Sequence, residues 1–87
     1  GLAKDLPPYV IVTGQPAVPR GINIEGLKRR DFTTEQIRNI KIAYKLLYTS
    51  DLRLEEASEK ISGLDEVSNE LQVMLDFLQV STRGIIR

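Results

Sequence analysis

One short stretch, Ile22–Asp31, carries the side chains best suited to binding a charged small molecule. Asn23 can donate and accept hydrogen bonds, and Glu25 can accept them from a ring N–H or a sugar hydroxyl. The adjacent Arg29 and Arg30 can each donate paired N–H groups to phosphate oxygens. The base, the ribose and the diphosphate of a sugar nucleotide would each find a counterpart, so this stretch is a candidate nucleotide site.

The same charges also have a purely structural interpretation. Asn23 is a good N-cap for a helix over Ile24–Arg30, with Glu25 in the first turn. Lys28, Arg29 and Arg30 would then lie in the last turn, and this order complements both ends of the helix dipole without any ligand. The residue chemistry alone therefore favours capping over nucleotide binding.

The sequence lacks the parts of most catalytic centres. It contains no histidine and no cysteine, which excludes Ser/His/Asp and Cys/His nucleophilic catalysis and thiolate metal sites within this chain. Glycine-rich phosphate loops are also absent from the sequence. We therefore predict no catalytic group, no metal site and no cofactor here. Six acids are expected on solvated helix faces, namely Glu55, Glu56, Glu59, Asp65, Glu66 and Glu70.

Length and charge limit the classes of partner. Twelve Lys and Arg balance twelve Asp and Glu over 87 residues, although the cations gather in residues 20–30 and the acids in residues 55–70. A neutral chain with one basic tripeptide makes few phosphate contacts, so nucleic-acid binding is not expected. No apolar run approaches the ~20 residues of a membrane span, and the absence of cysteine fits a reducing cytoplasm. Because the chain starts at Gly1, we expect it to be a piece of a longer protein.

Residues 1–20 differ in composition from the rest. They hold all four prolines around a β-branched run, Tyr9–Thr13, which predicts one short strand bounded by turns. A lone strand is not stable in water. We therefore expect this strand to pair with chain outside the sequence, with a second copy or with a partner.

Residues 21–87 contain no proline and show helical periodicity. Thr33 and Gln36 match a capping box, which predicts a helix that ends near Tyr48. One face of this helix would be apolar and would pack on a core. The members of that face are Ile37, Ile40, Ala43, Tyr44 and Leu47.

Two more amphipathic helices are predicted. One spans roughly Leu54–Ser62, with capping residues in the stretch 49–51 and a stop at Gly63. The other spans about Asp65–Val80 and leads to a closing segment with Gly84 in a turn. The fold class is therefore mainly α, with antiparallel helices behind the strand. The side chains of the last helix that we expect to face the core are Val67, Leu71, Met74, Leu75 and Leu78.

Three segments carry a resemblance to known proteins. LPPYVIVTGQPA resembles the closing coil of left-handed parallel β-helix acyltransferases built from hexapeptide repeats. RGINIEGLKRRDFTTEQIRNIKIAYKLLY is more specific, because it resembles the segment after the β-helix in bacterial acyl-[acyl-carrier-protein]:UDP-N-acetylglucosamine O-acyltransferases. STRGIIR resembles the C-terminus of the same family. The likeness covers essentially the whole chain, but only about the last third of a family member.

The resemblance implies a fold and a reaction. Residues 1–20 would be the last coil of the β-helix, and residues 21–87 a small antiparallel helical C-terminal domain. Family members are cytoplasmic homotrimers that transfer a 3-hydroxyacyl chain from acyl-carrier protein to the glucosamine 3-hydroxyl of UDP-N-acetylglucosamine, the first step of lipid A synthesis. The general base of the family is a histidine on the β-helix, so this chain alone is expected to be inactive.

The resemblance also implies site residues. Asn23 and Glu25 would hold the uridine end of the nucleotide, and Arg29 and Arg30 the diphosphate, in a site shared between subunits. Acyl-carrier protein is strongly acidic, and cations near this site are candidates for docking it. Besides the two arginines, these are Lys28, Lys41 and Lys45.

Two positions depart from the family pattern. Asp31 stands where glycine is common, and its carboxylate could compete for Arg30. Pro16 stands in a turn where some relatives have a histidine associated with the length of the acyl chain, so no chain length is predicted. The alternative interpretation is a free-standing, non-catalytic helical module whose basic first helix binds an acidic protein or a phosphate.

Overall fold

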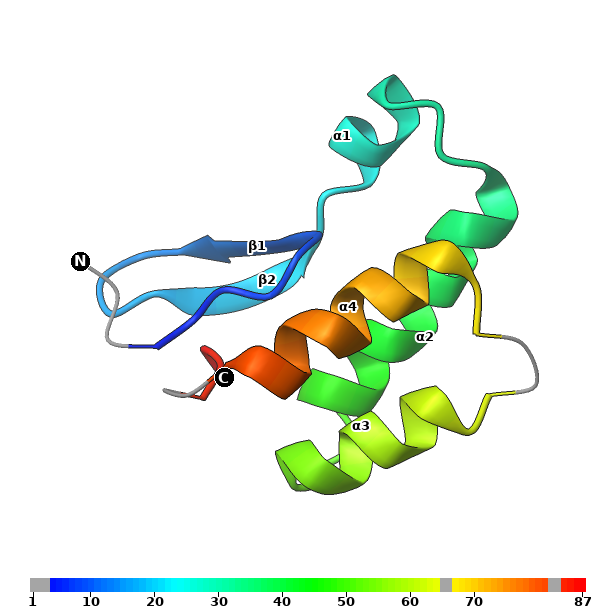
Figure 1. The fold of residues 1–87 in the computed structure, drawn as a ribbon. Helices are drawn as coiled ribbons and strands as arrows, with labels where there is room; N and C mark the ends of the chain where they lie inside the picture. Colours follow the sequence, from blue (N-terminus) through cyan, green and yellow to red (C-terminus); the bar gives the residue numbers. More distant parts are fainter. Residues whose placement is uncertain (1–3, 65–66, 82–83) are drawn as a thin grey trace.

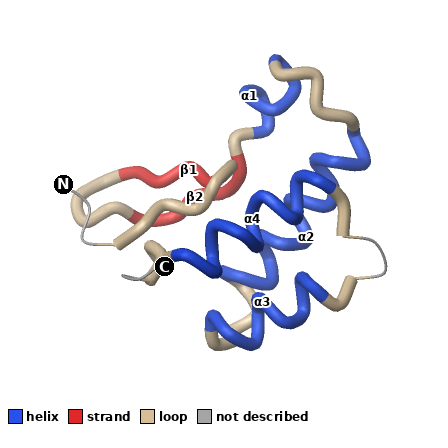
Figure 2. Tube along the Cα trace, in the orientation of Figure 1, coloured by secondary structure: helices blue, strands red, loops and turns tan. Residues whose placement is uncertain are grey.

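The computed structural model describes residues 4–64, 67–81 and 84–87. A hairpin lies on one side of three packed helices, and a short helix stands between the hairpin and the start of the longest helix (Figure 1, Figure 2). The elements are β1 (Val10–Thr13), β2 (Val18–Ile22), α1 (Ile24–Arg29), α2 (Thr34–Tyr48), α3 (Leu54–Ser62) and α4 (Asn69–Val80). No helix in the described residues is long and apolar enough to cross a membrane.

The predicted single strand is one half of an antiparallel hairpin, so the expectation of one strand with an outside partner was wrong. β1 pairs with β2 from Val10 opposite Ile22 to Thr13 opposite Val18, with a bulge at the centre. β2 was missed because it contains Pro19, which cannot donate to a ladder and is a poor strand signal. Proline is tolerated here because, in the described part of the chain, β2 pairs with a strand on one side only.

The helices largely follow the sequence signals. The capping box of α2 forms, with Thr33 Oγ1 accepting from Gln36 N at 3.1 Å and Gln36 Oε1 accepting from Thr33 N at 2.7 Å. α3 has the predicted bounds, with Gly63 at its C-cap, but its N-cap is Arg53. Thr49 and Ser50 do not cap α3, because their hydroxyls donate to the carbonyl of Lys45 at the end of α2.

α4 begins four residues later than predicted, at Asn69. Val67 lies before it and is half-buried, and residues 65–66 are outside the described part of the chain. The helix still turns its apolar face inward, with Leu71, Met74 and Leu78 buried. Leu75, expected on the same face, is half-buried.

Two clusters of buried side chains hold the elements together. The larger joins α2, α3, α4 and the C-terminal segment, and the smaller joins α1 to the first half of α2. α2 belongs to both, as its apolar periodicity predicted. The larger cluster contains Ala43, Leu47, Ala57, Ile61, Leu71, Met74, Leu78 and Ile85, and the smaller Leu27, Ile37 and Ile40.

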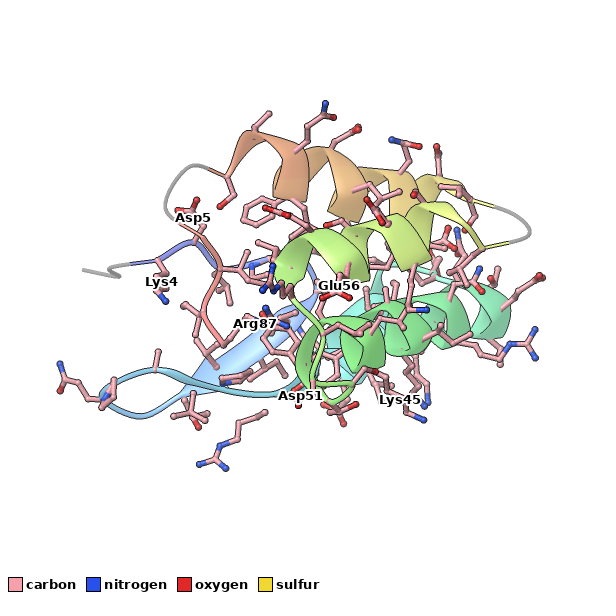
Figure 3. All side chains as sticks on the ribbon, turned by 90° about the horizontal axis from the view of Figure 1, so that it is seen from below. Lys4, Asp5, Lys45, Asp51, Glu56 and Arg87 are labelled. Atoms are coloured by element: carbon pink, nitrogen blue, oxygen red, sulfur yellow. The ribbon has the colours of Figure 1, made fainter. Side chains whose placement is uncertain are left out.

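The C-terminal segment ties both ends of the chain to the helices. Ile85 forms a parallel bridge with Asp5, after Gly84, whose φ is +76°. Arg87, labelled in Figure 3, is exposed and donates to the carbonyl of Leu47, 2.7 Å from its Nη2, and to that of Leu52. Because Leu47 is in the last turn of α2, this guanidinium satisfies a carbonyl that has no partner within the helix.

Glu70 corrects the expectation that the acids of residues 55–70 are all solvated. Its side chain is only 3% exposed and accepts hydrogen bonds from Ser68 Oγ and, at 3.0 Å, from Asn39 Nδ2. Burial raises the pKa of this carboxyl, but hydrogen bonds, chiefly those from Ser68 and Asn39, outweigh it, so that the pKa is lower than usual. Three acids are exposed as expected, namely Glu55, Glu56 and Glu59, whereas Asp65 and Glu66 lie outside the described residues.

Glu70 should make the free energy of unfolding depend on pH. The pKa of Glu70 is lower in the folded chain than in the unfolded chain, where it is ~4.3. The charged carboxylate therefore stabilises the fold fully at a pH above the unfolded-state pKa, and this contribution is lost as the pH falls through the folded-state pKa. Glu70→Gln should remove that dependence and cost about 1–3 kcal/mol at neutral pH. Asn39 and Ser68 both donate to Oε2, so an amide oxygen could accept from them, but it is a weaker acceptor than a carboxylate and the NH2 group would replace the other oxygen.

Urea denaturation at a series of pH values measures both effects. Glu59→Gln, a matched change at an exposed position of α3, should change the free energy of unfolding by less than about 0.5 kcal/mol. A Glu70→Gln variant that lost stability in acid as steeply as the parent protein would contradict the assignment.

Candidate functional site

The candidate site is built on α1, whose short length makes it depend on its ends. Asn23 is the N-cap, and its Oδ1 accepts from Gly26 N at 3.1 Å. Leu27 is the buried residue of this helix and packs with Ile37 and Ile40 of α2. A six-residue helix is not stable alone in water, so the cap and this single anchor fix its place between the hairpin and α2.

The other end of α1 is closed by a Schellman motif. The N–H of Phe32 donates to the carbonyl of Leu27 and that of Asp31 to the carbonyl of Lys28, both at 3.0 Å. This motif requires a left-handed residue after the C-cap, and Asp31 has φ of +64°. Glycine adopts that conformation without strain, which explains why a glycine is expected where this chain has Asp31.

The structure divides the four predicted nucleotide-binding residues between two faces of α1. Asn23 and Arg30 line a shallow hollow of about 190 Å³ between β1 and α1. Glu25 and Arg29 are outside that hollow, and as an i, i+4 pair they share another, exposed face of the helix. The structure therefore brings the residues together in two pairs, which are not gathered around one pocket within this chain.

The basic tripeptide, Lys28 to Arg30, is exposed and not neutralised. Within the described residues, no hydrogen bond or ion pair engages its three side chains or that of Glu25. Asp31, expected as a competitor, does not pair with Arg30. The unpaired carbonyls at the end of α1 partly explain why cations occur there, since cations in a last turn stabilise a helix by about 0.3–1 kcal/mol. Their charged groups nevertheless remain available to an anion.

The remaining predicted docking residues lie on another element. Lys41 and Lys45 are exposed on α2 and separated by one helical turn, and Lys45 projects from the last turn (Figure 3). With a rise of 1.5 Å per residue, Lys45 lies roughly 16 Å along the helix from Thr34, where α2 begins beside α1. Lys28 and Lys45 thus belong to separate parts of the surface.

Sequence reasoning missed Tyr9, which was expected only as the start of a strand. Tyr9 lines the same hollow as Asn23 and Arg30, and its carbonyl accepts from the N–H of Asn23 at 2.8 Å. Burial, and after it the charge of Glu70, raises the pKa of its phenol. Neither the contact nor the backbone conformation leaves a signal in the sequence.

The described residues contain no group of three or more His, Cys, Asp or Glu side chains that could hold a metal ion. Pro16, the other departure from the family pattern, lies exposed in the turn between β1 and β2 and follows a cis peptide bond. What the site offers chemically is therefore hydrogen bonding and positive charge.

Comparisons with known proteins show the family to which the chain belongs. Residues 5–86 match the family described as UDP-N-acetylglucosamine O-acyltransferase, domain 2. The crystal structure of a UDP-N-acetylglucosamine acyltransferase from Bacteroides fragilis is similar with a TM-score of 0.91 and 44% identity, over 97% of this chain and 33% of that one. The enzyme of the same name from Francisella novicida gives 0.90 and 44%, over 98% and 32%.

A third solved structure, a UDP-N-acetylglucosamine O-acyltransferase from Moraxella catarrhalis, gives a TM-score of 0.89 at 33% identity, over 97% of this chain and 33% of that one. The chain spans about a third of the length of each of these relatives. The family match extends from the segment before the hairpin to the C-terminal segment, and so includes α1 and its exposed charges. The chain therefore belongs to the UDP-N-acetylglucosamine O-acyltransferase family.

Proposed function

We propose that this chain is the C-terminal portion of an acyl-[acyl-carrier-protein]:UDP-N-acetylglucosamine O-acyltransferase and that α1 supplies its nucleotide contacts. One observation carries the proposal: in a chain of this family, Asn23, Glu25, Arg29 and Arg30 are exposed on α1 or at its caps, on two faces, and the arginines have no acidic partner among the described residues. Two guanidinium groups without counter-ions suit a diphosphate.

The reaction requires groups that this chain does not contain. Attack of the glucosamine 3-hydroxyl on the acyl thioester needs a base, and the sequence has no histidine. The base would therefore belong to the part of the enzyme that precedes residue 1, in the proposed left-handed β-helix. The 87-residue chain would bind and orient the nucleotide without turnover of its own.

The outer surface of the hairpin fits an element stacked against it. Ile11 and Val18 are 39% and 44% exposed, although β-branched side chains on a strand normally pack against a neighbour. The β-helix coil that would precede residues 1–20 in the intact enzyme would cover them. A homotrimer would bring a second subunit near α1, and the division of the candidate residues between two faces suits a nucleotide held by two subunits.

We further propose that the acidic acyl-carrier protein docks on Lys28, Lys41 and Lys45, in a cytoplasmic enzyme of lipid A synthesis. Complementary charge would speed encounter and orient the carrier. Because Lys28 and Lys45 lie apart, the carrier would touch two areas: α1 beside the nucleotide, and the exposed side of α2.

Arg29→Ala and Arg30→Ala, each in the intact acyltransferase, should raise the KM for UDP-N-acetylglucosamine by about 10-fold or more, because each removes charge-assisted hydrogen bonds worth roughly 1.5–3 kcal/mol. Steady-state kinetics with saturating acyl donor measures this. Arg38→Ala is the matched control, since Arg38 is an exposed arginine on α2. An unchanged KM in both α1 variants would exclude these arginines as nucleotide contacts.

Reversing the charges of Lys41 and Lys45 to glutamate should lower kcat/KM for acyl-carrier protein several-fold at low salt and much less at high salt, because screening weakens exposed charge pairs. The KM for UDP-N-acetylglucosamine should not change. Lys60→Glu, on the exposed surface of α3, is the control. Equal rates for the reversed and parent enzymes at low salt would exclude docking on α2.

A further inference from the structure

Tyr9 lies where the two buried clusters meet the hollow between β1 and α1. It packs against both buried clusters and lines the hollow that also contains Asn23 and Arg30. We propose that Tyr9 is a positioning residue for the nucleotide site: it ties the backbone of Asn23 to α4 and so fixes where the uridine end of the ligand binds. This inference rests on the proposed function.

The backbone of Tyr9 is held in an unfavourable conformation. Its φ is +73°, a region that bulky residues rarely adopt and that costs on the order of 1–3 kcal/mol. Such a conformation persists only where surrounding contacts enforce it. Without them, the residue would relax to negative φ and swing its carbonyl group away.

Two contacts of the side chain enforce this conformation. The phenol hydroxyl donates to the carbonyl of Glu70 at 3.3 Å, which reaches the first turn of α4. The ring meets Phe32 edge-on, with centroids 5.9 Å apart and planes at 69°, a favoured aromatic geometry. Phe32 is itself fixed by the Schellman motif that ends α1.

The backbone carbonyl passes this constraint to the site. It accepts from Asn23 N at 2.8 Å, one step beyond the last pair of the hairpin ladder. The side chain of Asn23 is confined as well, because its amide lies so close to Gly26 that a Cβ there would be 2.3 Å from Nδ2. Asn23 is thus held at its backbone by Tyr9 and at its side chain by Gly26.

The test is Tyr9→Phe in the intact acyltransferase, which removes the hydroxyl and keeps the ring. KM for UDP-N-acetylglucosamine should rise about three- to tenfold, the equivalent of one hydrogen bond, while kcat stays within about twofold. Tyr48→Phe is the matched control: its hydroxyl is buried and has no hydrogen-bond partner in the described structure, and it does not line the hollow. KM should not change in that variant.

The outcomes separate this inference from the proposed function. An unchanged KM for Tyr9→Phe, in an enzyme where Arg29→Ala raises KM, would overturn the role of Tyr9 and leave the function intact. Unchanged KM values in both would refute the function itself. A lower melting temperature and lower kcat at constant KM would show that Tyr9 is merely structural. If Tyr9→Phe does not fold, Phe32→Leu removes the other contact and should also raise KM.

Discussion

The buried face of α2 is the constraint on which the rest of the structure depends. Its first half, Ile37 and Ile40, packs with Leu27 of α1, and its second half, Ala43 and Leu47, packs with α3, α4 and Ile85. One continuous helix thus belongs to both clusters. Because a helix is stiff over 15 residues, the place of α1 is set by the same face that closes the helical core.

This arrangement explains why the charges of α1 are exposed. The helix has one buried side chain, Leu27, and its cap, its Schellman motif and the contact to Tyr9 supply the rest of its support. None of these interactions uses a charged side chain. The basic tripeptide contributes to α1 through the dipole, and its guanidinium and ammonium groups have no partner among the residues that the structure describes.

Local signals were sufficient to predict much of the fold. The capping box of Thr33 and Gln36 and the apolar periodicity that follows it fix α2, and the same logic gives the bounds of α3. Asn23 was predicted as the cap of α1 and is found there. These features depend on residues within one or two turns of each other, which is the range that sequence patterns report.

The missed features depend on contacts between distant residues. Glu70 looks like a surface acid until Asn39, far away in sequence, donates to it. β2 is hidden because Pro19 and Gly21 weaken a strand pattern that only its partner makes stable. The role of Tyr9 rests on a positive φ and on an acceptor in α4. The surface around α1 was predicted as a set of residues, but its division into two faces required the structure.

We propose that α1 binds the diphosphate of UDP-N-acetylglucosamine. The equilibrium affinity for this nucleotide tests the proposal, measured by titration calorimetry on the intact acyltransferase and on the double variant Arg29→Ala, Arg30→Ala. Loss of two charge-assisted contacts should weaken binding by about 100-fold or more. Equal affinities would exclude α1 as the diphosphate site and would mean that these arginines only complement the end of a helix.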